Sequence, residues 1–148
     1  MKNYRVLQLT NKTIGAVATN EFMPYGIITR KICYGKTNGG TFSVTTTGAD
    51  TIYLQEAGNY RISYSASLVA AAVGDVTISL IANGVNVYEV TETIAAVGDT
   101  VNLTLPYEVR VCPNSCAVPT NCPMSIQVQL NGVAITSGTS NILVEKVY

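Results

Sequence analysis

The segment NYRISYSASLVA, residues 59–70, alternates apolar and polar residues almost without interruption. Its apolar side chains occupy every second position, at Tyr60, Ile62, Tyr64, Ala66 and Leu68. The positions between them carry one arginine and three serines, at Arg61, Ser63, Ser65 and Ser67. A period of two places these sets on opposite faces of an extended chain. The segment therefore predicts a β-strand with one face in a core and the other open to solvent or a partner.

The same alternation recurs in DVTISLIA (75–82), TVNLTLPYEVRV (100–111) and MSIQVQL (124–130). Asn83-Gly84 and Asn131-Gly132 follow two of these runs, and Asn-Gly between apolar runs predicts a hairpin because both residues tolerate positive φ. Eight to ten short antiparallel strands are expected, with turns at roughly every 8–12 residues, which is typical of a β-sandwich or small barrel.

Composition excludes several classes of function. Charged residues make up 12% of the 148 residues, and nine basic residues balance nine acidic ones, so the chain offers no electrostatic footprint for nucleic acid or an anionic membrane. Histidine is absent, which removes the usual general base and the commonest metal ligand. No long apolar run predicts a membrane helix, and MKNYRVLQLTNK lacks the apolar core of a signal peptide. We therefore expect a non-enzymatic protein without a cofactor.

Two sets of residues are assigned by strand phase. Residues expected in the core or at a subunit interface are Tyr60, Ile62, Tyr64, Ile78, Leu80, Leu103, Ile126, Val128 and Val144. The opposite faces carry small uncharged residues, namely Ser63, Ser65, Ser67, Thr77, Ser79, Asn102 and Thr104. Such a face suits packing against a second copy of the chain. The alternative is an ordinary solvent-facing surface rich in serine and threonine.

Residues 1–25 differ from the rest of the chain. They are more polar and show fewer strand signals after Leu9. We expect an arm outside a sandwich formed by residues 26–148, and this arm would attach the protein to an anchor. The alternative is an edge strand followed by a loop.

Three of the four cysteines lie in RVCPNSCAVPTNCPMSI, residues 110–126. The spacing of Cys112, Cys116 and Cys122 is not that of a usual zinc site, and no histidine completes one. The three prolines of the segment predict a stiff loop between two strands, without a metal. If these strands pair as a hairpin, a disulfide can join Cys112 to Cys122. The alternatives are that all thiols are free, Cys33 included, or that the four cysteines hold zinc.

Asp75 and Asp99 each end a copy of AAVGD. Calcium requires six to eight oxygen ligands, and an isolated Gly-Asp turn supplies few of them. We expect both aspartates to bond to their own turns, with calcium binding as the alternative.

Four stretches in order resemble a known family. TIYLQEAGNYRISYSASL (51–68), VTISLIANGVNV (76–87), AVGDTVNLTL (96–105) and GTSNILVEKVY (138–148) are similar to parts of C1q/TNF-like jelly-roll domains. The similarity extends especially to the C-terminal domains of collagen-like spore-surface (exosporium) glycoproteins. The resemblance implies an all-β antiparallel jelly-roll β-sandwich of ten strands that forms a tight homotrimer. It also implies display, adhesion or receptor engagement, without catalysis.

Two features depart from the spore glycoproteins, namely the lack of a Gly-X-Y stalk and the cysteine-rich insertion. The stand-alone architecture looks more like a small bacteriophage head-fibre or capsid decoration protein. We therefore expect a structural protein of the virion surface that binds a capsid or other surface protein through residues 1–25, with a host-surface glycan or receptor as a further partner. The alternatives are a spore-surface jelly-roll protein and a carbohydrate-binding module that uses some of the nine tyrosines.

Overall fold

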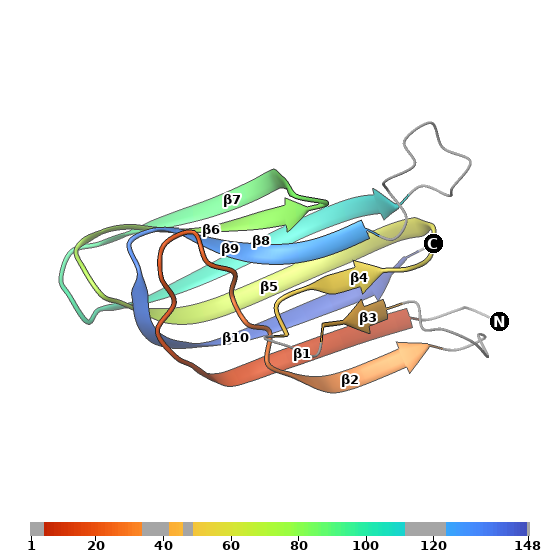
Figure 1. Ribbon diagram of the computed structural model, residues 1–148, viewed down its shortest axis with the longest axis horizontal. Helices are drawn as coiled ribbons and strands as arrows, with labels where there is room; N and C mark the ends of the chain where they lie inside the picture. The colour runs from red at the N-terminus through yellow and green to blue at the C-terminus, as the bar shows by residue number, and fades with distance from the viewer. Residues whose placement is uncertain (1–4, 34–41, 46–48, 112–123, 148) are drawn as a thin grey trace.

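The computed structural model describes residues 5–33, 42–45, 49–111 and 124–147. They form two five-stranded antiparallel sheets that pack face to face (Figure 1). The first sheet has the strand order β2-β1-β10-β5-β8 and the second has the order β3-β4-β9-β6-β7. The strands are β1 (Arg5–Ile14), β2 (Ile27–Cys33), β3 (Phe42–Val44), β4 (Ile52–Leu54), β5 (Gly58–Ala70), β6 (Gly74–Ala82), β7 (Val85–Ile94), β8 (Thr100–Val111), β9 (Met124–Gly132) and β10 (Ile135–Lys146).

The chain changes sheet repeatedly. It passes from the second sheet to the first between β4 and β5 and returns to the second for β6 and β7. The last three strands then alternate, with β8 in the first sheet, β9 in the second and β10 in the first. The central strands β5 and β10 pair antiparallel although they are far apart in sequence. This arrangement confirms the expected antiparallel jelly-roll sandwich.

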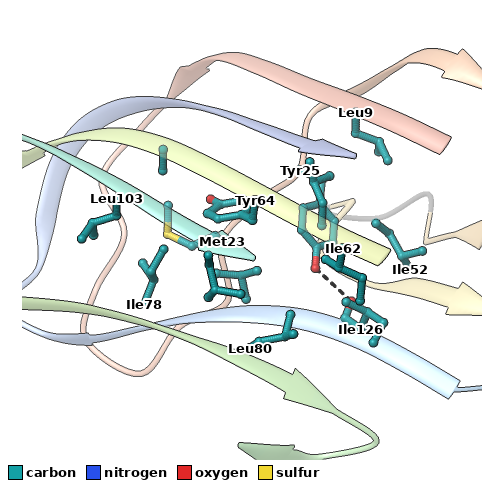
Figure 2. Packing of buried hydrophobic residues seen from close by; sticks show 14 of the residues in the cluster. Leu9, Met23, Tyr25, Ile52, Ile62, Tyr64, Ile78, Leu80, Leu103 and Ile126 are labelled. Atoms are coloured by element: carbon teal, nitrogen blue, oxygen red, sulfur yellow. Dashed lines mark hydrogen bonds between the residues drawn. The ribbon is translucent and has the colours of Figure 1, made fainter. Parts of the chain in front are cut away.

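The core lies between the two sheets. All nine residues assigned to a core or interface by strand phase belong to its hydrophobic cluster, and none is more than 1% exposed. Figure 2 shows residues of both sheets meeting there, with Leu103 from β8 on one side and Ile78 from β6 on the other. The Tyr25 and Tyr64 rings meet edge to face, with centroids 6.4 Å apart.

The first strand is part of the sandwich. β1 lies between β2 and β10, and its pairing with β10 begins at Arg5↔Lys146. Leu7 and Leu9 are fully buried in the core cluster. The expectation of an arm over residues 1–25 is therefore wrong for residues 5–14. The short alternation within RVLQLT places Leu7 and Leu9 inside, although polar residues dominate the segment that follows.

Residues 17–25 continue into the second sheet. The amide of Met23 donates to the carbonyl of Val128 at 2.7 Å, and Phe22 forms a bridge with Gln129 of β9. Met23 and Tyr25 are fully buried, and the Tyr25 hydroxyl donates to the Ile126 carbonyl at 2.9 Å (Figure 2). The structure thus shows no domain boundary at residue 25, because this segment ties the first sheet to the second.

A buried charge cluster closes one end of the sandwich. Glu56 Oε2 lies 3.3 Å from Arg5 Nε and 3.2 Å from Lys146 Nζ. The Arg5 and Glu56 side chains are only 4% and 8% exposed. Buried charges require such pairing because desolvation is costly. The cluster therefore fixes the start of β1 and the end of β10 to the turn before β5.

The two Asn-Gly turns have different roles. Asn83 and Gly84 have φ values of 50° and 79° and close the β6–β7 hairpin, as expected. Asn131-Gly132 does not close a hairpin, because β9 and β10 belong to different sheets. Gly132 has a φ of 78°, and a Cβ there would collide with the backbone carbonyl oxygen of Asp75. The second turn therefore serves a crossover between the sheets.

Candidate functional site

The outer face of the first sheet, which points away from the core, is assembled from four strands. The pairing of β1, β10, β5 and β8 sets Thr10, Asn141, Ser65 and Thr104 in one row across the sheet. Neighbouring rows contain Thr139, Ser67 and Asn102 on one side, and Gln8, Leu143, Ser63 and Pro106 on the other. These side chains are uncharged and most are short. They leave a shallow hollow of ≈ 350 Å³ that includes Thr10, Ser65, Ser67, Asn102 and Thr104 in its lining.

Many polar groups on this outer face have no side-chain partner. Gln8 and Thr10 both donate to Asn141 Oδ1, at 2.9 and 3.0 Å. Within the described parts of the chain, by contrast, no side-chain hydrogen bond involves Ser63, Ser65, Ser67, Asn102 or Thr104. Their hydroxyl and amide groups are available to water or to a second protein.

The outer face of the second sheet is bonded within itself. Thr77 and Thr91 hydroxyls lie 2.7 Å apart, and Asn131 Nδ2 donates to Ser79 Oγ at 2.8 Å. The sequence interpretation grouped Thr77 and Ser79 with the serines of β5 as one type of face. The structure places Thr77 and Ser79 on a different surface from those serines. The alternation correctly predicted which residues of β6 face away from the core. It did not predict that β6 belongs to a different sheet from β5.

An aromatic seam lies where edge strands β7 and β8 meet. The rings of Tyr88 and Tyr107 are 5.9 Å apart between centroids and tilted by 31°. Tyr88 is 40% exposed, and the partly buried Val90 and Val109 pack against the core beside this pair. Tyr107 lies partly buried at this margin and packs against the core cluster. The seam supplies an apolar surface that is chemically unlike the outer face of the first sheet.

One charged row crosses the first sheet. Arg61 pairs in register with Glu145 on one side and Glu108 on the other. Arg61 Nε lies 3.3 Å from Glu108 Oε1, and the two side chains are 58% and 71% exposed. A second hollow of ≈ 480 Å³ is lined by Arg61, Glu108 and Arg110 among others.

Other sequence expectations concern bound ions and cysteines. In the parts of the chain that the structure describes, no three Cys, Asp or Glu residues gather as metal ligands would. The prediction that Asp75 bonds to its own turn is wrong, because its Oδ1 accepts a hydrogen bond at 2.8 Å from Thr93 on the neighbouring strand β7. Cys112, Cys116 and Cys122 lie outside the described residues. The strands that flank them, β8 and β9, are in different sheets, so the hairpin on which the disulfide interpretation depended is absent.

The described residues contain no helix of the length and apolarity that a membrane crossing requires.

Comparison with known proteins identifies the fold. No family model and no curated protein matches the sequence. Eiger TNF from S. frugiperda has a similar structure, with a TM-score of 0.76 and 8% identity over 99% of this chain and 94% of that one. The globular domain of zebrafish complement 1qA gives 0.69 at 5% identity, covering 97% and 98%. PRD1 vertex protein P5 gives 0.58 at 16% identity, covering 97% of each chain. These similarities show that the chain has the C1q/TNF-like jelly-roll fold that its sequence resembles.

Proposed function

We propose that this chain is a non-enzymatic structural subunit that forms a homotrimer and is displayed on a bacteriophage virion, as a head fibre or capsid decoration protein. The observation that carries the proposal is the contrast between the outer faces of the two sheets. Polar side chains of the second sheet bond to one another, whereas the side chains of Ser63, Ser65, Ser67, Asn102 and Thr104 of the first sheet have no hydrogen bond to any residue that the structure describes. A partner that covers these rows, which are uncharged across β10, β5 and β8, can satisfy the groups.

The partner that fits best is another copy of the chain. The apolar seam at Tyr88 and Tyr107 and the serine-rich rows on the outer face of the first sheet are different surfaces of one protomer. A contact between unlike surfaces is heterologous, and it forms a closed ring when the rotation between copies closes. A three-membered ring is what the C1q/TNF-like resemblance implies. Short side chains on the receiving face allow the next protomer to approach closely.

Location on a virion is supported by one similarity. PRD1 vertex protein P5 has a similar fold over 97% of this chain, and its name places that protein at a vertex. Residues 5–25 are held in the sandwich, so we place the contact with a capsid or other anchor protein on the folded surface. Adhesion to a host-surface glycan or receptor is the expected role of the displayed trimer.

Light scattering of the purified protein at micromolar concentration tests the assembly. We expect a mass three times the 15.7 kDa of the chain, and a monomer would overturn the proposal. Thr104→Arg, which places a charge on the outer face of the first sheet, should lower the trimer fraction. Thr91→Arg makes the same change on the outer face of the second sheet and is the matched control, expected to remain trimeric.

Imaging of virions with a labelled antibody tests the location. We expect labels at regular positions on the particle surface. Label on bacterial spores and none on virions would favour the spore-surface alternative and would leave the trimer intact.

A further inference from the structure

The charged row on the first sheet is complementary to itself. Glu145, Arg61 and Glu108 lie side by side on β10, β5 and β8 and alternate in sign, and Arg110 follows two residues along β8. Two carboxylates and two guanidinium groups carry no net charge together. The row is therefore unsuited to capturing a free anion or cation, and it matches another row of alternating charge.

This row also stands apart from its surroundings. The rows of Ser63, Ser65 and Ser67 next to it are uncharged across β10, β5 and β8. In a single protomer the Arg61–Glu108 pair is more than half exposed, and such pairs contribute little to stability. Between two proteins, by contrast, close charge pairs contribute strongly to specificity because the wrong juxtaposition is repulsive.

We propose that the charged row sets the register of the homotrimer, with Arg61 of one copy pairing with Glu108 of the partner subunit. The inference rests on the proposed function and deepens it by naming the residues that select the correct contact. Rotation about a threefold axis keeps each residue at its own height along that axis. When the strands run along the axis, the charged end of one outer face therefore meets the charged end of the next protomer. A slipped contact would place charges against the uncharged rows and leave them desolvated and unpaired.

Charge-reversal variants, studied singly and as a mixture, distinguish the pairing of Arg61 with Glu108 between subunits from the same pairing within one protomer. Arg61→Glu makes the centre of the row uniformly negative, and Glu108→Arg makes it uniformly positive. Each variant alone should raise the trimer dissociation constant about 10- to 100-fold, because like charges then face each other in all three contacts. When the two variants are mixed, two of the three contacts in a mixed trimer pair opposite charges. Native mass spectrometry of the equimolar mixture should then show more mixed trimers than random exchange of subunits gives.

The controls separate the possible failures. Glu89→Lys, on the outer face of the second sheet, should leave the dissociation constant unchanged, and circular dichroism should show that all variants are folded. Charge-reversal variants that assemble as well as Glu89→Lys, or a mixture without preference for mixed trimers, would overturn the register role and leave the trimer standing. A monomeric unmodified protein would overturn the proposed function itself. If a reversal variant does not fold, Arg61→Gln and Glu108→Gln replace it. They should abolish the weakening of the trimer by salt, and an unchanged salt dependence would contradict the proposal.

Discussion

The outer faces of the two sheets are built from similar residues and behave differently. Both are rich in serine, threonine and amide side chains on alternating strand positions. On the second sheet Thr77 bonds to Thr91 and Asn131 bonds to Ser79, so the polar groups stabilise the protomer. On the first sheet the side chains of the central serines, which surround a shallow hollow, make no hydrogen bond within the described part of the chain. Two faces of similar polar composition therefore differ in how many of their polar groups are hydrogen-bonded within the protomer, and composition alone does not reveal this difference.

The greatest loss of stability is expected when the N-terminal strand of the first sheet is removed. Deleting residues 1–25 removes β1, including Leu7 and Leu9, together with Met23 and Tyr25 from the core. We expect loss of folding, because the deletion empties part of the core and removes the strand that lies between β2 and β10. Thermal unfolding followed by circular dichroism is the measurement. A deletion variant that unfolds cooperatively and remains trimeric would restore the interpretation of residues 1–25 as an arm.

A matched pair of core substitutions tests whether the two faces share one core. Leu103 lies behind the first outer face and Ile78 behind the second, and both are at most 1% exposed. Leu103→Ala and Ile78→Ala should each lower the free energy of unfolding by about 2–5 kcal/mol, the usual cost of a cavity in a packed core. Chemical denaturation measures both. Native stability in either variant would mean that the phase of that strand is wrong.

Alkaline titration probes the segment that joins the sheets. Burial raises the pKa of Tyr25 well above its ordinary value of 10.0, with Tyr64 and Asp50 adding to the shift. Because the pKa is raised in the folded state, the neutral side chain stabilises the protein below pH 10, and this contribution is lost as the pH rises from 10 toward the folded pKa. We expect stability to fall by about 1.4 kcal/mol per pH unit for this group in that range.

Tyr25→Phe isolates that contribution. The variant should be about 1 kcal/mol less stable near pH 8, because it lacks the hydrogen bond to the Ile126 carbonyl. Its stability should decline less steeply above pH 10 than that of the unmodified protein. Denaturation curves at pH 8 and pH 11 measure both effects, and equal declines would show that Tyr25 does not titrate as its burial requires.

Removal of single hydroxyl groups should change stability least, and it compares the two outer faces directly. Thr77→Val removes one partner of the bond to Thr91 and should lower the free energy of unfolding by about 1 kcal/mol without changing the trimer. Ser65→Ala removes a hydroxyl that has no partner within the protomer, and it should leave protomer stability within about 0.5 kcal/mol. Unfolding and trimer dissociation are measured on both variants. A reversed pattern would mean that the second sheet carries the interface.

Several features were predictable because they depend on local pattern. The alternation of residues 59–70 assigned Tyr60, Ile62 and Tyr64 to the inside, and all three are fully buried. Four short stretches in order sufficed to indicate the jelly-roll fold, which the similar solved structures confirm.

Residues 5–25 show what local pattern misses. Leu7 and Leu9 carry a strand signal of only a few residues, and Met23 and Tyr25 stand in a stretch without regular alternation. Their burial comes from partners far away in the sequence, such as Val128 and Ile126. No pattern within the segment specifies those partners, and for this reason a packed segment resembled an arm.

The alternation of residues is enough to tell which side of each long strand faces inward, because a period of two in the side chains follows from the geometry of an extended chain. The sheet that each strand joins depends on the folded chain as a whole. Asn83-Gly84 and Asn131-Gly132 are the same dipeptide, yet one closes a hairpin and the other carries the chain from one sheet to the other. The same choice placed Ser65 on an unpaired face and Thr77 on a bonded one. The physical reason is that a strand's neighbours are set by long-range pairing and by burial of the whole core, and neither is contained in the alternation of a single segment.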